Sequence, residues 1–167
     1  LTLLDMEVVN KESKGLQRLK SINVLPDCIA IQQDIGKTSI ALFLADLQYK
    51  CIKEEEANLE MFDFLWETVL SLAKDNGSIV NYHLLFMLSF AKHLGFYPNT
   101  RDIQEGSFFD KREGVFSMNK PEHPDFIPPH LSDQLIALLN LQLGFQAEHQ
   151  SFILDRSDLL DHLLTFY

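Results

Sequence analysis

The residues of this 167-residue chain that are best suited to chemistry are a Gly-Lys-Thr triplet, two cysteines and two proline-flanked histidines. Residues 36–38 read Gly-Lys-Thr before a helical pattern, like the tail of a phosphate-binding loop. The leading glycine of such a loop and the buried strand before it are both missing. We therefore interpret the triplet as a helix N-terminus with Thr38 as its cap, and the sequence gives no support to nucleotide hydrolysis.

The other candidates give weak signals for catalysis or metal binding. Cys28 and Cys51 form no CxxC pair, and Cys51 falls on the apolar side of a helical pattern, where a thiol acts as a small hydrophobic group. His123 and His130 lack sulfur or carboxylate partners at metal-ligand spacing. The glutamates at 54–56 fit a solvated helix end. We predict no catalytic residue, metal or cofactor; a small hydrolase using either histidine remains an alternative that mutation would test.

The charge is unevenly distributed along the chain. Residues 1–37 carry five basic and five acidic groups, so residues 38–167, with nine basic and nineteen acidic groups, account for the whole net charge of −10. Such a surplus makes the larger part a poor nucleic-acid binder by itself. The exception is KESKGLQRLK at 11–20, which offers four candidate phosphate contacts: Lys11, Lys14, Arg18 and Lys20. The alternative is that these cations only solvate a junction between domains.

Hydrophobic periodicity predicts a mainly α-helical chain. Five segments show helical patterns. The first starts near residue 38, the second starts at Asn58 as its N-cap, and the third lies in 78–95 and ends at Gly95. The last two lie in 131–145 and 151–167. The pattern in 78–95 is apolar almost all round, which indicates the central helix. The expected apolar stripes of the other four comprise Ile40, Phe43, Leu44, Leu47 and Cys51; Phe62, Leu65, Trp66, Val69 and Leu72; Leu135, Leu138, Leu139 and Leu143; and Ile153, Leu154, Leu159, Leu160, Leu163 and Leu164.

Extended structure is expected in only two places. Residues 1–10 alternate apolar and polar side chains and predict a strand, whereas Leu16, Leu19 and Ile22 have the spacing of a short helix. Residues 107–118 predict a small hairpin whose turn needs the positive φ that Gly114 can adopt. The proline-rich segment 120–130 predicts an irregular loop. The fold class is thus a helical bundle with one inserted hairpin and one residual N-terminal strand.

No stretch is apolar over the roughly 18 residues that cross a bilayer, and the first ten residues do not resemble a signal peptide. Two unpaired cysteines fit a reducing compartment. We expect a cytoplasmic protein without a membrane partner.

The phrases GLQRLKS, KTSIALFLADLQYK, EEEAN, MFDFL, LGFYPN and FFDKREGVFS occur in this order over almost the whole chain. Together they resemble the RecO family of DNA repair proteins, and more narrowly its branch whose C-terminal domain lacks zinc. The resemblance implies three parts: residues 1–10 as the last strand of an oligonucleotide-binding (OB-fold) barrel, 11–37 as a junction, and 38–167 as the helical domain.

The resemblance also implies the function of a recombination mediator and no enzymatic activity. Family members bind single- and double-stranded DNA, anneal strands, pair with RecR and engage the acidic C-terminal tail of the single-strand-binding protein so that RecA can load. An apolar groove for that tail would need a cationic rim, for which Lys50, Lys53 and Lys92 are candidates. Many relatives hold a zinc knuckle with four cysteines where residues 98–116 lie. Here we expect hydrophobic packing instead, by Phe108, Phe109, Val115 and Phe116.

One alternative of a different class is a helical protein–protein adaptor that does not touch DNA. Salt-dependent binding of single-stranded DNA distinguishes the two, because only the mediator predicts an affinity that falls steeply with salt.

Overall fold

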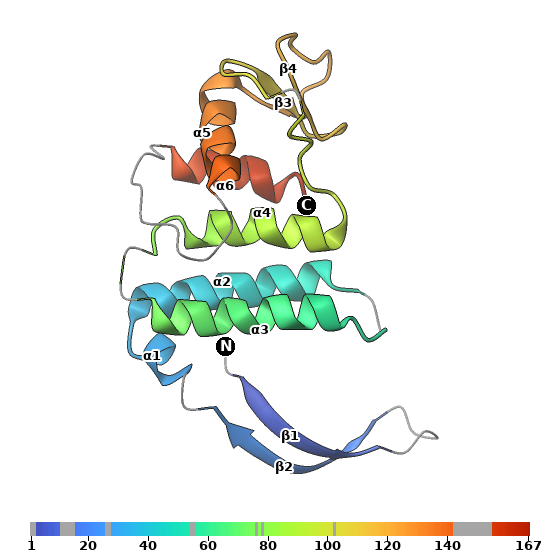
Figure 1. The fold of residues 1–167 in the computed structure, drawn as a ribbon, viewed down its shortest axis with the longest axis vertical. Helices are drawn as coiled ribbons and strands as arrows, with labels where there is room; N and C mark the ends of the chain where they lie inside the picture. Colours follow the sequence, from blue (N-terminus) through green and yellow to red (C-terminus); the bar gives the residue numbers. More distant parts are fainter. Residues whose placement is uncertain are drawn as a thin grey trace. The chain divides into compact units, whose positions relative to one another are not determined.

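The computed structural model describes residues 3–10, 16–25, 28–53, 56–75, 77, 79–101, 103–141 and 155–167. The chain divides into two compact units, an N-terminal unit Leu1–Asn76 and a C-terminal unit Gly77–Tyr167. The described residues form six helices, a two-stranded sheet and a three-stranded sheet, which confirms the predicted mainly α-helical class (Figure 1). The unit boundary falls inside the range 38–167, so the expected helical domain spans both units.

The N-terminal unit begins with an antiparallel hairpin of β1 (Leu4–Val9) and β2 (Arg18–Val24). The predicted strand is confirmed by β1, but the short helix predicted from Leu16, Leu19 and Ile22 is wrong. The register shifts between Glu7 and Val8: Glu7 pairs with Ser21 and Val8 with Leu19, so Lys20 is the extra residue of a β-bulge. The bulge changes the spacing of residues on one face of β2 from two to three, as between Leu19 and Ile22, which is how this strand imitates helical spacing.

The short helix α1 (Ile29–Gln32) leads into the long helix α2 (Ile35–Cys51). The N-cap of α2 is Asp34, whose carboxylate accepts a 3.0 Å hydrogen bond from the backbone N–H of Lys37, so the prediction of Thr38 as the cap is wrong. The Thr38 hydroxyl instead donates to the carbonyl of Ile31 in α1 at 2.7 Å. The buried side of α2 comprises Lys37, Ala41, Leu44 and Leu47, which confirms Leu44 and Leu47 of the expected stripe.

Helix α3 (Leu59–Lys74) begins as the sequence predicts. The side chain of Asn58 accepts a 3.0 Å hydrogen bond from the N–H of Met61, which confirms the N-cap. Val69 and Leu72 are buried as expected, but Phe62 is 56% exposed and its place in the predicted core stripe is wrong. The helix ends at Lys74, before Gly77.

The C-terminal unit is built on α4 (Tyr82–Leu94), which ends where predicted, at Gly95 with φ +87°. Eight of its 13 residues are buried, more than in any other described helix, which agrees with its expected central position. Helix α5 (Pro129–Asn140) buries Leu135 and Leu138 of its expected stripe. Helix α6 (Arg156–Leu164) buries Leu159 and Leu163, while Leu164 is exposed. The predicted stripe residues Leu143, Ile153 and Leu154 lie outside the described residues.

A three-stranded sheet completes this unit. The predicted hairpin is confirmed by β3 (Phe108–Asp110) and β4 (Val115–Ser117), joined by a turn in which Gly114 has φ +66°. A third strand, β5 (Phe126–Ile127), pairs with the other edge of β3. The prediction that the proline-rich segment 120–130 is irregular throughout is therefore wrong at these two residues, and also at Pro129 and His130, which begin α5.

Within the described part of the chain, no helix is long and apolar enough to cross a membrane.

Candidate nucleic-acid and partner interface

The β1–β2 hairpin has one polar face and one apolar face, because paired residues point to the same side of a sheet. The polar face carries the pairs Asp5–Asn23, Glu7–Ser21 and Val9–Arg18, and the bulge residue Lys20 joins it through an ion pair with Glu7. Ser21 also donates to Glu7, with 3.5 Å between Oγ and Oε2. This face presents basic groups to solvent, but Glu7 neutralises one of them.

The opposite face carries apolar side chains alone. Its members, each between 39 and 58% exposed, are Leu4, Met6, Val8, Leu19, Ile22 and Val24. Six apolar side chains on one side of two strands normally form one wall of a core. We refer to these six as the hairpin's apolar face.

Of the predicted DNA contacts, Arg18 and Lys20 lie on β2, at the first residue of the strand and at the bulge. Lys11 and Lys14 lie outside the described residues. The ion pair between Lys20 and Glu7 has side chains 61 and 58% exposed, so it is weak and open to exchange with other anions. Sequence reasoning missed Glu7, although its place opposite the basic segment follows once the hairpin is recognised.

The three lysines proposed for a groove rim belong to different units. Lys50 and Lys53 lie at the end of α2 and just beyond it, and Lys92 lies in the last turn of α4. All three are exposed, and Lys50 Nζ is 2.7 Å from Asp46 of the same helix. Burial raises the pKa of the neighbouring Cys51 thiol and outweighs the positive charges of Lys53 and Lys50, which favours the protonated thiol over the thiolate.

The sheet of the C-terminal unit packs through aromatic rings. Phe109 and Phe116, from paired strands, are 0 and 5% exposed with ring centroids 4.9 Å apart. Phe109 also meets Phe166 beyond α6 edge to face at 5.4 Å, and Phe166 meets Phe96 beyond α4 at the same distance. The expected packing by Phe109 and Phe116 is confirmed, while Phe108 and Val115 are only half-buried.

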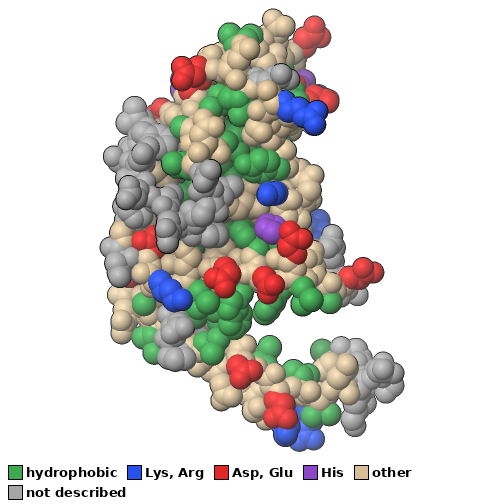
Figure 2. Space-filling view, in the orientation of Figure 1, with side chains coloured by type: hydrophobic (Ala, Val, Ile, Leu, Met, Phe, Trp, Pro, Cys, Tyr) green, Lys and Arg blue, Asp and Glu red, His purple; other side chains and the backbone are tan. Residues whose placement is uncertain are grey.

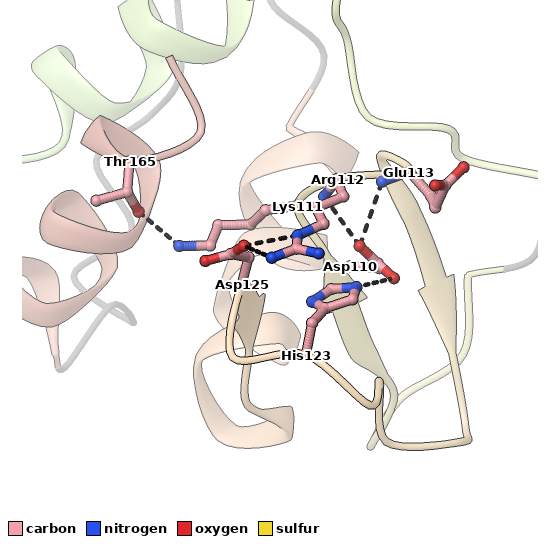
Figure 3. Close-up of polar contacts among 7 residues, drawn as sticks. All are labelled: Asp110, Lys111, Arg112, Glu113, His123, Asp125 and Thr165. Atoms are coloured by element: carbon pink, nitrogen blue, oxygen red, sulfur yellow. Dashed lines mark hydrogen bonds and ion pairs between the residues drawn. The ribbon is translucent and has the colours of Figure 1, made fainter.

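Polar contacts fix the hairpin turn and the loop that follows it (Figure 3). One oxygen of Asp110 accepts from the backbone N–H groups of Arg112 and Glu113 at 2.9 and 3.2 Å, and the other lies 3.0 Å from His123 Nε2. The Arg112 guanidinium holds Asp125 through two nitrogens, at 2.6 and 2.5 Å. Burial alone would raise the pKa of Asp110, but the two backbone donors and His123 outweigh it and hold that pKa below its usual value.

A model of the family described as "Recombination protein O C terminal" matches residues 32–167. The chain belongs to the RecO family.

Curated RecO proteins are similar to the chain over most or all of its length. The DNA repair protein RecO of Flavobacterium johnsoniae is 33% identical over 167 residues, covering 100% of this chain and 68% of the relative. That of Bacteroides fragilis is 32% identical over 142 residues, covering 84% of this chain and 59% of the relative. That of Azobacteroides pseudotrichonymphae is 28% identical over 169 residues, covering 100% of this chain and 69% of the relative. The chain thus spans roughly three fifths to two thirds of these RecO proteins, and no solved structure matches it significantly.

The residues present do not fit the zinc site that the resemblance attributes to many RecO proteins. Residues 98–116 contain no cysteine, and the described residues contain no group of three or more histidines, cysteines and carboxylates that could hold a metal ion. His123, weighed above as a ligand, lies against Asp110 instead. In this RecO chain, the rings of Phe109 and Phe116 pack together in the segment that corresponds to the zinc knuckle.

The lysine of the Gly-Lys-Thr triplet has a structural role. Lys37 is 7% exposed, and its Nζ donates a 3.0 Å hydrogen bond to the carbonyl of Ala73 in the last turn of α3. The carbonyl groups in this last turn have no partner within the helix, and they form the negative end of the helix dipole. The buried ammonium therefore supplies both a hydrogen-bond donor and a compensating positive charge. Lys37 thereby joins the start of α2 to the end of α3 and does not face a phosphate.

Proposed function

We propose that this chain is part of a non-enzymatic recombination mediator that binds single- and double-stranded DNA and anneals complementary strands. In this role it acts in the cytoplasm, without metal or cofactor, and works with RecR and the tail of the single-strand-binding protein during loading of RecA. The observation that carries the proposal is the match of the family's C-terminal region to residues 32–167. Membership of the RecO family already implies DNA and recombination partners in general terms.

We assign DNA contact to the segment 11–20, of which Arg18 and Lys20 are described. Both lie on the polar face of an exposed hairpin, which also carries the carboxylates of Asp5 and Glu7. Because the whole chain carries a net charge of −10, the contact is local and its strength depends on salt.

We also propose that the hairpin is the residual part of an OB-fold barrel, for which the sequence analysis expected only the strand at residues 1–10. Its uncovered apolar face supports this reading, since the inner wall of a barrel alternates with a polar outer wall along each strand. On this proposal β2 belongs to the barrel, so that of the junction expected at 11–37 only residues 25–37 remain between the barrel and the helical domain at 38–167.

For the acidic tail of the partner protein, we retain Lys50, Lys53 and Lys92 as cationic candidates. Tyr49, which is 87% exposed, precedes Lys53 by four residues, so an aromatic ring and a cation both occur at the C-terminal end of α2. A peptide with apolar residues before a free carboxylate needs this combination.

Fluorescence anisotropy of a labelled oligonucleotide, measured with the full-length polypeptide at 50 and 200 mM salt, tests the function. The mediator requires binding that weakens by an order of magnitude or more over this range. Absence of binding at the lower salt would favour the alternative, a protein–protein adaptor that does not bind DNA. The acidic charge of residues 38–167 is the observation that supports this alternative.

A further inference from the structure

Two buried hydroxyl groups of the C-terminal unit have no hydrogen-bond partner among the described residues. Ser107, directly before β3, is 1% exposed, and Ser132, in the first turns of α5, is 0% exposed. Charged side chains of this unit lie at its surface in Figure 2, in contact with solvent, whereas these two hydroxyls are enclosed. A hydroxyl group loses its hydration on burial and normally gains a partner in exchange. The two serines therefore indicate a partner of another kind.

The position of Ser132 in α5 explains why its hydroxyl is unpaired. A buried hydroxyl in a helix can donate to the carbonyl four residues earlier, as Thr68 does to Phe64 at 2.8 Å. For Ser132 that carbonyl belongs to Pro128, which already accepts from the backbone N–H groups of Leu131 and Ser132, at 3.1 and 2.8 Å. A carbonyl oxygen has two lone pairs, and both are used here. The hydroxyl of Ser132 therefore needs an acceptor from outside its own turn.

Ser107 and Ser132 flank one contact between two elements. The backbone N–H of Gly106 donates a 2.7 Å hydrogen bond to Oδ1 of Asp133. Ser107 follows Gly106 and Ser132 precedes Asp133, so this bond brings the two serines to the same boundary, where β3 packs against α5. The two hydroxyls do not bond to each other. A small polar molecule between them would satisfy both.

Water is the ligand that suits this boundary. The carboxylate of Asp133, next to Ser132, disfavours an anion, and three or more metal ligands are nowhere grouped in the part of the chain that the structure describes. A buried water molecule needs roughly two to four polar partners and can both donate and accept, which matches two hydroxyl groups. The start of α5 favours the water oxygen further, because no side chain caps its first N–H groups.

We propose that one ordered water molecule is bound between the segment before β3 and the first turns of α5, held by the hydroxyl groups of Ser107 and Ser132. The water is then a structural part of the contact that fixes the three-stranded sheet on α5. This goes beyond the proposed function, because it concerns how the C-terminal unit is held together and does not depend on DNA binding.

A double-mutant cycle in the full-length polypeptide tests the site. Ser107→Ala, Ser132→Ala and the double variant are compared by urea unfolding, followed through NMR signals of the C-terminal unit. Ser89→Ala is the matched control, alone and combined with Ser132→Ala. Ser89 is also a buried helical serine, 8% exposed, but its hydroxyl donates to the carbonyl of Leu85 in its own helix at 3.1 Å.

Each single substitution at the site removes one partner of the water and should lower the ratio of folded to unfolded protein about fivefold. The double variant should be about as stable as either single variant, because the water is lost only once. The effects of Ser89→Ala and Ser132→Ala should simply multiply. Unchanged or raised stability in both single variants at the site would overturn the proposal, since replacing an unpaired buried hydroxyl with a methyl group costs nothing. Effects that multiply in the double variant would also overturn it.

The water is also observable directly. Nuclear Overhauser contacts of the sign typical of long-lived water should appear at the amide protons of residues 107 and 132 in the wild type and disappear in the double variant. They should persist in Ser89→Ala. A wild type without these contacts would exclude an ordered water at the boundary.

Discussion

The ring of Phe109 meets the ring of Phe166 edge to face, with 5.4 Å between their centroids. This contact joins the central strand of the three-stranded sheet to the residues that follow α6. From there Phe96 extends the packing to the end of α4, and the Tyr167 hydroxyl donates to the carbonyl of Met87. The interruption between α4 and α5 is therefore held by side chains that also fix the C-terminal residues.

Phe109→Ala should destabilise the C-terminal unit by about 3–5 kcal/mol, because a fully buried ring with two ring partners is lost. Phe108→Ala is the matched control. Phe108 is half-buried and its ring meets that of Phe126 edge to face at the rim of the sheet's packing, so its loss should cost clearly less. Urea unfolding followed by circular dichroism gives both values. Equal costs would show that the two faces of the hairpin are packed alike.

Lys37→Met should cost about 1–3 kcal/mol, because methionine keeps most of the apolar stem but leaves the Ala73 carbonyl without its donor. Lys50→Met removes an exposed pair with Asp46 four residues away and should cost about 0.5 kcal/mol or less. The comparison is made by thermal unfolding of both variants. If Lys37→Met unfolds like the wild type, the ammonium does not cap α3.

The stability of the C-terminal unit should fall as the pH drops below about 6.5. Burial, together with the nearby Arg156, lowers the pKa of His83, and burial with Lys111 lowers that of His162. The unfolded chain then takes up protons more readily than the folded one, so stability is fully present above pH 6.5 and is lost towards the folded pKa values. His83→Gln with His162→Gln should flatten this slope in urea titrations between pH 7.5 and 5.5. An unchanged slope would assign it to other groups.

A second loss should appear at lower pH. The pKa of Asp110 is held below its ordinary value, so its contribution is present above about pH 4 and disappears as the pH falls through the folded value. Asp110→Asn keeps an acceptor for the N–H groups of Arg112 and Glu113 but cannot titrate. The variant should therefore lose the acid-dependent step while retaining the hairpin, as monitored by the chemical shifts of the turn. A step that persists in Asp110→Asn would point to another carboxylate.

Local chemistry predicted much of the fold. Asn58 as N-cap, Gly95 as the left-handed end of α4 and Gly114 in the hairpin turn are each set by a requirement within a few residues. The errors have two sources. The bulge at Lys20 depends on pairing with β1, which is distant in the sequence, whereas α2 begins at residue 35 because the neighbouring Asp34 caps it, and the Thr38 hydroxyl binds the carbonyl of Ile31.

The candidate interface was predictable only in part. The composition of residues 11–20 indicated the basic segment, but the partner of Lys20 depends on strand register, which single-sequence periodicity misread. Similarly, Phe62 has ideal core spacing on α3 and yet is exposed. Helical spacing identifies which residues share an apolar face, but it does not show which of them other parts of the chain cover.

Glu7→Gln should strengthen DNA binding by the full-length polypeptide a few-fold at low salt. Glu7 competes with phosphate for the Lys20 ammonium. Replacing its carboxylate releases the ammonium and also eliminates a negative charge that repels the DNA. Arg18→Ala should act in the opposite direction, weakening binding and lowering the slope of log affinity against log salt by about one. Anisotropy titrations at several salt concentrations measure both effects. Asp46→Asn is the matched control for Glu7→Gln, because it breaks a similar exposed pair, with Lys50, outside the basic segment and should leave the affinity nearly unchanged. An equal gain in both carboxylate variants would reflect net charge alone and would contradict a contact at the hairpin.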